Sequence, residues 1–429
     1  MAKTYDKKNH FTLPPPSLTF LSTENSDFTY RDLYSFTGNL QHILQPYKPG
    51  NEHPLMIVSE NSPDVALSIA ACFLLKIPVF PLLKNSTKRD LEKILSEIRP
   101  CAILSNEQNL SIKFGDIPVL NITEEKLKYS ESNQPAGYAF DEPEHIAGYF
   151  LTSGSTGQPK IVPVKRRQVF SGAVSSAKNF RPARNKYWLL CLPLNHVGGI
   201  NVIYRSLLYN SAVFLMPSFD TENVRSLLNE NKDFEAASMV PTMLQRLLDH
   251  TFFRVQFGFK ALLIGGGPIS TSLINSSLTR GIPIVTSYGM TETCAQIAAN
   301  PMLKPGGDYI PKKSVGAIFE PNEIEIRDEQ GRPLPYNEPG QIWLKGPQVF
   351  DGYLDKNQNA AAFDEKGWFN TGDFGHLNRK KQLFIENRRS DLIITGGENV
   401  NPMEIEEAMN LIPGVKESAV IGVPDEIWG

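Results

Sequence analysis

The sequence contains few cysteines, and none lie close enough together to form a metal or redox motif. The four, Cys72, Cys101, Cys191 and Cys294, are far apart and include no Cys-x-x-Cys pair. The seven histidines form no cluster with the spacing of metal ligands, which argues against a structural metal site. Widely separated cysteines are typical of proteins whose thiols stay reduced. These absences favour a cytoplasmic protein with buried free thiols and no disulfide framework.

A long apolar run and a strong excess of one charge are also missing. The longest apolar run, residues 66–75, is too short to span a bilayer. The N-terminal sequence MAKTYDKKNHF lacks the apolar core of a signal peptide. The formal net charge is −3, without any basic tract, so nothing suggests a polyanionic partner. We therefore expect neither a membrane span nor a nucleic-acid partner.

What is present is a large apolar content arranged in alternating strands and helices. Hydrophobic residues make up 41% of the 429 positions, enough for about two or three structural units. Strand-like runs cover residues 55–59, 79–82 and 101–104, and helix-like stretches cover 28–44, 63–75 and 88–98. We expect Thr29 to cap the first helix. The alternation continues to about residue 267 and predicts an α/β fold with parallel sheets flanked by helices.

The pattern changes near Lys313. The segments EIEIRD, GQIWLKG and QLFIENR read as short strands between Pro/Gly turns, and they predict a smaller β-rich subdomain. A last segment from about Arg389 contains a strand, a glycine loop, a helix over residues 402–411 and another strand over residues 418–423. We expect that last strand to expose an unpaired edge.

The most informative motif is the hydroxyl-rich loop within YFLTSGSTGQPK, residues 149–160. After a strand-like run it contains Thr152, Ser153, Gly154, Ser155, Thr156 and Gly157, followed by Lys160. Such small residues let backbone N–H groups and hydroxyls approach an anion closely, as in phosphate-binding loops. The Gly-Lys-Ser/Thr spacing of the common P-loop is absent, which argues against a kinase or GTPase.

A glycine triplet marks a second candidate contact with a ligand. Gly265, Gly266 and Gly267 follow an apolar strand. At the carboxyl end of a parallel strand, glycines let a flat ligand lie against the backbone. The same triplet also suits a tight turn between a strand and a helix, and both interpretations stay open.

Polar and aromatic residues further along the chain offer groups that suit a nucleotide. Tyr288 offers a ring for stacking on a base, and Thr291 and Glu292 offer a hydroxyl and a carboxylate for a hard cation such as Mg²⁺. A Thr-Glu pair alone also begins helices. Asp373 could accept hydrogen bonds from ribose hydroxyls, although its TGD triplet is otherwise typical of a turn. Arg388 could place a fixed positive charge beside a nucleotide.

The order of these motifs is more specific than any one of them. The hydroxyl-rich loop, GGGP, YGMTET, FNTGD and NRRSDLIITGGEN follow one another along the chain. In this order they resemble the adenylate-forming superfamily of acyl- and aryl-CoA ligases, luciferases and peptide-synthetase adenylation domains. Within it, the o-succinylbenzoate–CoA ligases of menaquinone biosynthesis are similar to LPLNHVGGINVIYRSLLYNSAVFLM, LLIGGGPIS, PIVTSYGMTETCAQI and RRSDLIITGGENVNPMEIE.

The resemblance implies an AMP-forming acid–thiol ligase. A carboxylate attacks the α-phosphorus of ATP, pyrophosphate leaves, and the acyl group then passes to the thiol of coenzyme A. Such a reaction requires the neutralisation of several phosphate charges. The implied cofactors are ATP, Mg²⁺ and coenzyme A, and the implied acid is o-succinylbenzoate. A homo-oligomer is left open.

The resemblance also assigns roles to individual residues. Residues 152–160 hold the β- and γ-phosphates, Tyr288 and the Gly265–Gly267 loop enclose adenine, and Gly289 borders both the nucleotide and the acid. Thr291 contacts the α-phosphate, and Glu292 binds Mg²⁺. Asp373 and Arg388 hold the ribose.

Three further residues are assigned to the acid and to coenzyme A. His196 matches a gate residue at the acyl pocket, although a lone histidine is more often structural. Arg205 is our candidate partner for a second carboxylate of the substrate; alternatively, it points to solvent or pairs with an acid. Gly397 belongs to a loop that matches the lining of a pantetheine channel.

The resemblance divides the chain into three parts. These are an N-terminal ATP- and acyl-binding domain over residues 1–387, a hinge over 388–391 that includes Ser390, and an incomplete, small α+β C-terminal lid domain over 392–429. We expect the large domain to contain two helix-flanked parallel-type sheets and the β-rich subdomain. The catalytic lysine that the family places near its C-terminus has no counterpart here. We therefore expect a truncated enzyme that retains its ATP and acid sites but adenylates slowly.

Two other functions remain open from the sequence. One is a CoA ligase for another aryl or short acyl acid, which the same motifs would serve. The other is a non-catalytic nucleotide-binding fragment, which the missing lysine favours.

Overall fold

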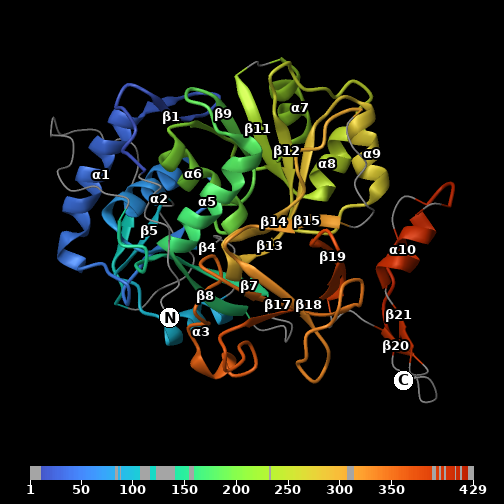
Figure 1. The fold of residues 1–429 in the computed structure, drawn as a ribbon. Coiled ribbons are helices and arrows are strands. Elements are labelled where there is room, and N and C mark those ends of the chain that lie inside the picture. The colour runs from blue at the N-terminus through green and yellow to red at the C-terminus, as the bar shows by residue number, and fades with distance from the viewer. Residues whose placement is uncertain are drawn as a thin grey trace.

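The computed structural model describes residues 11–82, 86, 88–106, 116–121, 141–153, 159–230, 233–306, 314–388, 393–395, 398–400, 402–410, 412–415 and 418–423. The strands in these residues form sheets of thirteen, six and two strands. Figure 1 shows helices packed on and between the two large sheets, with the C-terminal elements to one side.

The six-stranded sheet is parallel except at one edge. Its order is β6-β5-β3-β4-β7-β8, and only the β7–β8 pair is antiparallel. The strands are β3 (Leu55–Val58), β4 (Val79–Leu82), β5 (Ala102–Ser105), β6 (Val119–Asn121), β7 (Ile146–Ser153) and β8 (Pro159–Lys165). All residues of β3, β4 and β5 are buried, because parallel sheets are covered on both faces. Their sequences are therefore continuous apolar runs, as predicted.

Parallel strands also make up half of the thirteen-stranded sheet. The order β13-β12-β11-β9-β10-β1 is parallel throughout, and β2 adds an antiparallel edge. These strands are β1 (Thr19–Ser22), β2 (Asp27–Thr29), β9 (Tyr187–Leu190), β10 (Ala212–Leu215), β11 (Phe234–Met239), β12 (Ala261–Ile264) and β13 (Ile284–Met290).

The other half of this sheet is antiparallel and begins at β13 itself. Residues 284–286 of β13 pair in parallel with β12, while residues 287–290 pair with the antiparallel β14. The sheet continues through β14 (Ala295–Ala299), β15 (Ser314–Ile318), β19 (Gln382–Arg388), β18 (Phe369–Leu377), β17 (Gly340–Lys345) and β16 (Glu323–Arg327). The predicted boundary near Lys313 was therefore wrong, because β14 already belongs to this part, and its strands extend the parallel sheet.

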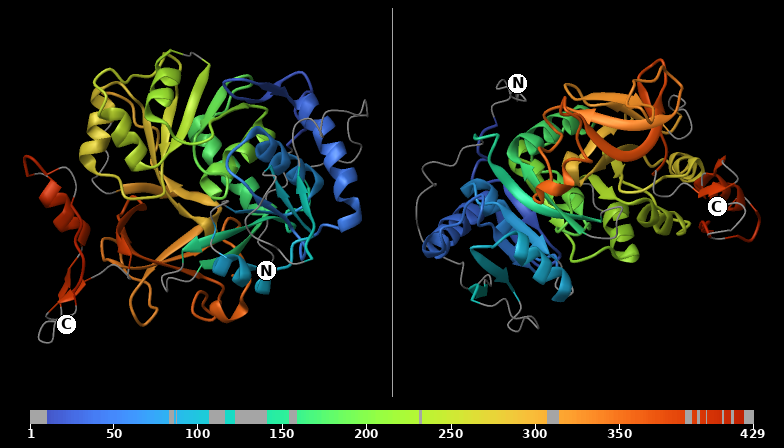
Figure 2. Two further views of the ribbon diagram at one scale, coloured as in Figure 1. Left: turned by 180° about the vertical axis from the view of Figure 1, so that it is seen from behind. Right: turned by 90° about the horizontal axis from the view of Figure 1, so that it is seen from below.

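The helices form layers around these sheets (Figures 1 and 2). Helices α1 (Tyr30–Leu44), α2 (Pro63–Leu75), α5 (Arg166–Phe180) and α6 (Val197–Tyr209) share one large core with strands of both sheets. Helices α7 (Thr221–Glu230), α8 (Pro241–Leu248) and α9 (Thr271–Thr279) cover the other face of the parallel strands in the thirteen-stranded sheet. Helix α3 (Lys88–Glu97) packs on the outer face of the six-stranded sheet. Because α2 is surrounded, it is apolar all round rather than amphipathic.

Short-range signals determine where several helices begin. Thr29 caps α1, and its backbone N–H donates to the Asp32 Oδ2 atom at 2.7 Å, which completes a capping box. This confirms the predicted cap. Ser62 caps α2, and Pro63 occupies the first turn of that helix, where its missing N–H costs no hydrogen bond.

The C-terminal elements lie beside the main body (Figure 2). They are the hairpin of β20 (Ile393–Thr395) and β21 (Glu398–Val400), and helix α10 (Pro402–Asn410). The predicted strand over residues 418–423 was wrong: these residues are in neither a strand nor a helix. The backbone N–H of Val420 instead donates to Glu406 Oε1 of α10 at 2.9 Å. A strand requires a neighbouring strand for its hydrogen bonds. An apolar sequence alone does not ensure that such a neighbour is present.

None of the helices in the described part of the chain has both the length and the hydropathy needed to cross a bilayer.

Replacing Phe73 with alanine should lower the free energy of unfolding by about 3–5 kcal/mol. Phe73 is 1% exposed in the layer between the sheets, and its ring stacks on that of Tyr204 with centroids 4.4 Å apart. The matched control is Phe257→Ala, because Phe257 is fully exposed. Urea denaturation should show a change below about 0.5 kcal/mol for the control. Equal losses for both variants would contradict a packed core between the sheets.

Candidate active site

The hairpin formed by β13 and β14 presents the first group of candidate residues. The 3-10 helix η2 (Thr291–Thr293) forms its tip, where the Thr293 Oγ1 atom donates to the Ala295 carbonyl oxygen at 2.7 Å. A Cβ atom at Gly289 would lie 1.9 Å from that same carbonyl oxygen. Gly289 is therefore required by the close approach of the two strands, whatever it contacts in a complex.

Glu292 at this tip is buried and held in place. Its side chain is only 6% exposed, and the hydroxyl of Tyr353 donates to its Oε1 atom at 2.8 Å. Its backbone carbonyl oxygen accepts from the Phe350 N–H at 2.9 Å and from the Gln168 Nε2 atom at 3.2 Å. Burial, and then the charge of Glu292, raise the pKa of Tyr353, so the phenol stays a hydrogen-bond donor.

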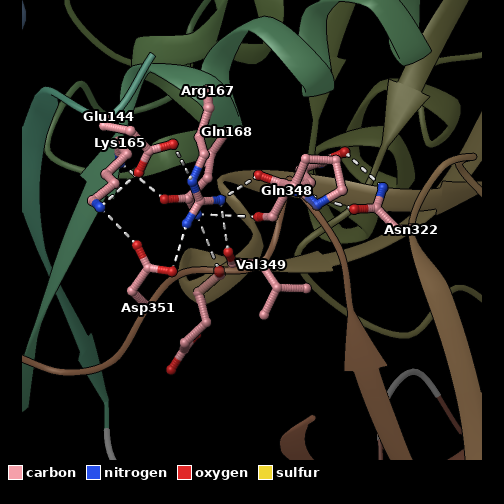
Figure 3. A network of polar contacts seen from close by, with 10 residues as sticks. Glu144, Lys165, Arg167, Gln168, Asn322, Gln348, Val349 and Asp351 are labelled. Atoms are coloured by element: carbon pink, nitrogen blue, oxygen red, sulfur yellow. Dashed lines mark hydrogen bonds and ion pairs between the residues drawn. The ribbon is translucent and has the colours of Figure 1, made fainter. Parts of the chain in front are cut away.

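A buried polar network fastens the segment that carries Tyr353 to helix α5 (Figure 3). Arg167 is 1% exposed; its guanidinium donates to the carbonyl oxygens of Pro347 and Val349 and forms an ion pair with Asp351 at 2.8 Å. Lys165 pairs with the same aspartate at 2.8 Å. These contacts bring residues 347–351 against the first turn of α5.

Two glutamines, Gln168 and Gln348, complete this network (Figure 3). The Gln168 Nε2 atom bridges the carbonyl oxygens of Glu292 and Gln348, the latter at 3.1 Å. The Gln348 Nε2 atom donates to the carbonyl oxygens of Thr293 and Gln296. The backbone of the η2 turn is therefore held in place by side chains that are distant in sequence.

The stem of the hydroxyl-rich loop lies beside this turn. Thr152 of β7 pairs with Lys160 of β8, and both strands contact η2. The Lys160 ammonium lies 4.6 Å from the centroid of the Tyr353 ring. The predicted residues Gly154, Ser155, Thr156 and Gly157 lie outside the described residues, as does the side chain of Ser153.

Tyr288 and Asp373 meet on the other side of the hairpin. The Tyr288 hydroxyl donates to Asp373 Oδ2 at 2.6 Å, and Asp373 is 5% exposed. Thr371, Gly372 and Asp373 lie inside strand β18 rather than in a turn, and the Asp373 N–H donates to the Thr371 hydroxyl at 3.1 Å. Asp373 of β18 is in register with Arg388 of β19, although the side chain of Arg388 lies outside the described residues. The structure thus brings together three residues that are up to 100 positions apart in sequence.

The glycine triplet lies at the end of β12, next to β13. A Cβ atom at Gly265 would lie 2.9 Å from the Ser287 hydroxyl oxygen, and this hydroxyl donates to the Ile264 carbonyl oxygen at 3.1 Å. Gly266 has a φ of +78°, which favours glycine. The triplet forms a tight turn beside the strand of Tyr288, so the two interpretations of its sequence are compatible.

His196 and Arg205 lie at opposite ends of α6. His196 is the N-cap residue, and burial lowers its pKa, so the ring is neutral at pH 7. The Arg205 side chain is buried, donates from Nη1 to the Ser176 hydroxyl at 3.0 Å, and stacks on Trp188 with Cζ 4.2 Å from the ring centroid. Burial lowers its pKa to about 10, so it stays charged. The alternative in which Arg205 points to solvent is therefore wrong.

The Arg205 guanidinium uses only part of its hydrogen-bonding capacity. Its Nε atom has no hydrogen-bond partner among the described residues. Arg205 also lies close to Cys294, the residue that follows η2: burial raises the pKa of the Cys294 thiol, and the positive charge of Arg205 partly opposes this rise. The neighbouring Asn201 Nδ2 atom donates to the Cys294 carbonyl oxygen at 3.2 Å. Helix α6 therefore packs beneath the hairpin, with a buried cation next to it.

Residues that support the site were missed in the sequence. Tyr353, Gln168, Gln348 and Arg167 follow no motif that distinguishes them from core or surface residues. Their importance depends on contacts across more than 50 positions, for which a single sequence contains no local signal. Ser390 and Gly397, predicted for the hinge and the pantetheine channel, lie outside the described residues.

The observed geometry fits a bound Mg²⁺ and a nucleotide. A buried carboxylate oxygen such as that of Glu292 is the ligand type that Mg²⁺ prefers, usually shared with substrate phosphates. The Lys160 ammonium group lies over the ring of Tyr353, whose hydroxyl contacts this carboxylate. The Tyr288–Asp373 pair offers a ring and a carboxylate on the same hairpin.

Comparison with known proteins confirms the resemblance and the α/β fold class. The profile of the AMP-binding enzyme family matches residues 11–354. The 2-succinylbenzoate–CoA ligase of Enterococcus faecalis is 32% identical over 424 residues, which cover 98% of this chain and 83% of that protein. Two structures of o-succinylbenzoate–CoA synthetase from Bacillus subtilis are also similar, each with a TM-score of 0.85 and 29% identity. The complex with its acyl-adenylate intermediate covers 96% of this chain and 84% of the other. For the complex with ATP and magnesium, these shares are 96% and 86%. The chain therefore belongs to the AMP-binding enzyme family.

Proposed function

We propose that this chain is an ATP-dependent acid–thiol ligase whose acid is 2-succinylbenzoate. The acid's carboxylate oxygen attacks the α-phosphorus of ATP and pyrophosphate leaves; the sulfur of coenzyme A then attacks the acyl carbon and AMP leaves. The observation that carries the proposal is the β13–β14 hairpin. It presents Glu292 toward Tyr353 on one side and Tyr288 toward Asp373 on the other. One short segment therefore serves both ends of a nucleotide.

The nucleoside end would be held by the second of these groups. Tyr288 and the Gly265–Gly267 turn form the base site, with Gly289 alongside. Asp373 accepts hydrogen bonds from the ribose hydroxyls, and Arg388 lies in register with it on the next strand. The 2.6 Å hydrogen bond from Tyr288 keeps the Asp373 carboxylate oriented before the ribose arrives.

The phosphate end would be held by the first group. The hydroxyl-rich loop contributes Thr152, Ser153, Gly154, Ser155, Thr156 and Gly157, and Lys160 adds a positive charge. Thr291 contacts the α-phosphate, and Glu292 is the protein ligand for Mg²⁺. When bound, the cation neutralises phosphate charge as pyrophosphate leaves. The residues of the chain supply orientation and exclude water around the reacting groups.

The acid would bind beneath the hairpin, along α6. His196 is neutral and closes the pocket at the first turn of the helix, while Arg205 provides a buried positive charge for the second carboxylate. The incompletely satisfied guanidinium supports this role. The stacking of Arg205 on Trp188 and its bond to Ser176 also suit a structural residue, which would favour a ligase for another acid.

We also propose the domain division given by the resemblance. Strand β19 ends at Arg388, and the next strand, β20, belongs to a separate two-stranded sheet. This supports a boundary at the hinge 388–391 between the domain of residues 1–387 and that of residues 392–429. Gly397 in the second domain would line the channel for the pantetheine arm of coenzyme A.

Binding of acyl-sulfamoyl adenosines, which mimic the acyl-adenylate, tests the choice of acid. The 2-succinylbenzoyl compound should bind at least about tenfold more tightly than the 4-oxo-4-phenylbutanoyl compound, which lacks the ring carboxylate, because one charge-assisted contact is worth about 1.4 kcal/mol or more. Calorimetry measures both dissociation constants. Tighter binding of another acyl group would indicate a different acid. ATP–pyrophosphate exchange with the same acids then distinguishes a ligase from a non-catalytic nucleotide-binding protein.

Replacing Arg205 with glutamine should remove most of that preference. The ratio of the two dissociation constants should fall about tenfold, since the neutral side chain cannot pair with the second carboxylate. Affinity for Mg·ATP should stay unchanged. Arg225→Gln is the matched control, because Arg225 lies on α7 and pairs with Glu222. An unchanged ratio in the Arg205 variant would assign this arginine a purely structural role.

Replacing Asp373 with asparagine should weaken the binding of AMP and ATP by about tenfold or more. The variant retains the shape of the side chain but loses its charge, and hydrogen bonds to charged groups contribute about 1.5–3 kcal/mol. Fluorescence titration with AMP measures the effect. Asp328→Asn is the control, since Asp328 pairs with Arg332 in a surface turn. Equal affinities for the Asp373 variant and the unmodified protein would contradict the ribose site.

A further inference from the structure

Tyr353 contacts both charged residues at the phosphate end of the site. Its hydroxyl donates to Glu292 Oε1 at 2.8 Å, and the Lys160 ammonium lies 4.6 Å from its ring centroid. The side chain is only 9% exposed. Lys160 comes from β8 and Glu292 from the η2 turn, so one aromatic ring joins two elements that are distant in sequence.

The Tyr353 ring is fixed from its other sides as well. The ring of Phe350 packs edge-on against it, with centroids 4.9 Å apart and an interplanar angle of 72°. The Tyr353 N–H donates to Asn359 Oδ1 at 2.7 Å, and the Asn359 Nδ2 atom donates back to the Tyr353 carbonyl oxygen at 3.2 Å. The next residue, Leu354, donates from its N–H to the Ile161 carbonyl oxygen at 3.0 Å. Tyr353 is therefore held rigidly against β8, beside Lys160.

A phenol in this position can orient two opposite charges at once. The neutral O–H donates to a carboxylate, while the face of the ring attracts an ammonium group. Preorganised groups of this kind raise affinity because less ordering is needed when the ligand binds.

We propose that Tyr353 is the positioning residue that sets Glu292 for Mg²⁺ and Lys160 for the phosphates of ATP. The inference rests on the proposed function, in which these two residues contact the metal and the nucleotide. Tyr353 acts through the carboxylate by its hydroxyl and through the lysine by its ring, so the two effects can be separated by substitution.

Tyr353→Phe removes only the hydroxyl and leaves the ring under Lys160. The dissociation constant for Mg·ATP, measured by calorimetry, should rise about tenfold. That for ATP in the presence of EDTA should change less than about twofold, since the lysine contact remains. Tyr353→Leu removes the ring as well and should weaken ATP binding under both conditions. Tyr34→Phe is the matched control, because Tyr34 lies on α1, away from the site, and its hydroxyl likewise donates to an oxygen atom, the Pro14 carbonyl oxygen at 2.6 Å. Both constants should stay unchanged.

The outcomes separate this inference from the function on which it rests. If the unmodified protein binds Mg·ATP more tightly than ATP alone and Tyr353→Phe retains the full difference, Tyr353 has no positioning role, while the proposed nucleotide site stands. Equal weakening with and without Mg²⁺ in Tyr353→Phe would likewise overturn the inference, because a general structural defect would affect both. If the unmodified protein binds neither form of ATP, the proposed function fails together with it.

Discussion

The close approach of β13 and β14 is the constraint on which the candidate site depends. Strand β13 leaves its parallel neighbour after Thr286 and continues as one arm of an antiparallel hairpin. At Gly289 the two backbones are so close that a Cβ atom would meet the Ala295 carbonyl oxygen at 1.9 Å. This crossing directs Tyr288 toward Asp373 and carries Glu292 to the buried tip. A larger residue at position 289 would separate the arms and move both groups.

A network of buried polar side chains supports the hairpin at its η2 turn. Placing Arg167 in the interior is costly, because a charge loses its hydration there. The cost is offset by two backbone carbonyl oxygens and the Asp351 carboxylate. Gln168 and Gln348 extend these contacts to the backbone of η2. Because removal of one partner would leave the others unsatisfied, such a network holds one geometry or fails as a unit. That rigidity suits a site that must orient ions.

Much of the fold could be predicted, since its strands and helices are continuous apolar runs. The parallel strands β3 and β4 and the buried helix α2 were predicted because burial on both faces needs no alternation. Thr29 was identified as a cap from its local pattern. The strand at residues 418–423 was not correct, because an apolar sequence does not show whether a partner strand is beside it. The boundary of the β-rich part was misplaced for the same reason. Strand β14 belongs to this part because it pairs with β13, and the sequence of one strand does not show which strand it pairs with.

The sequence by itself determined the family, through the order of its motifs, and which residue types are available for a nucleotide: Tyr288, Glu292 and Asp373 among them. Only the tertiary structure decided how they meet, and it added Tyr353, Gln168 and Gln348 as their supports. It also decided that Arg205 is buried rather than exposed. The physical reason is that helix starts and buried strands follow from neighbouring residues, whereas hydrogen bonds and ring contacts between residues more than 50 positions apart exist only once the two sheets have packed around their common core.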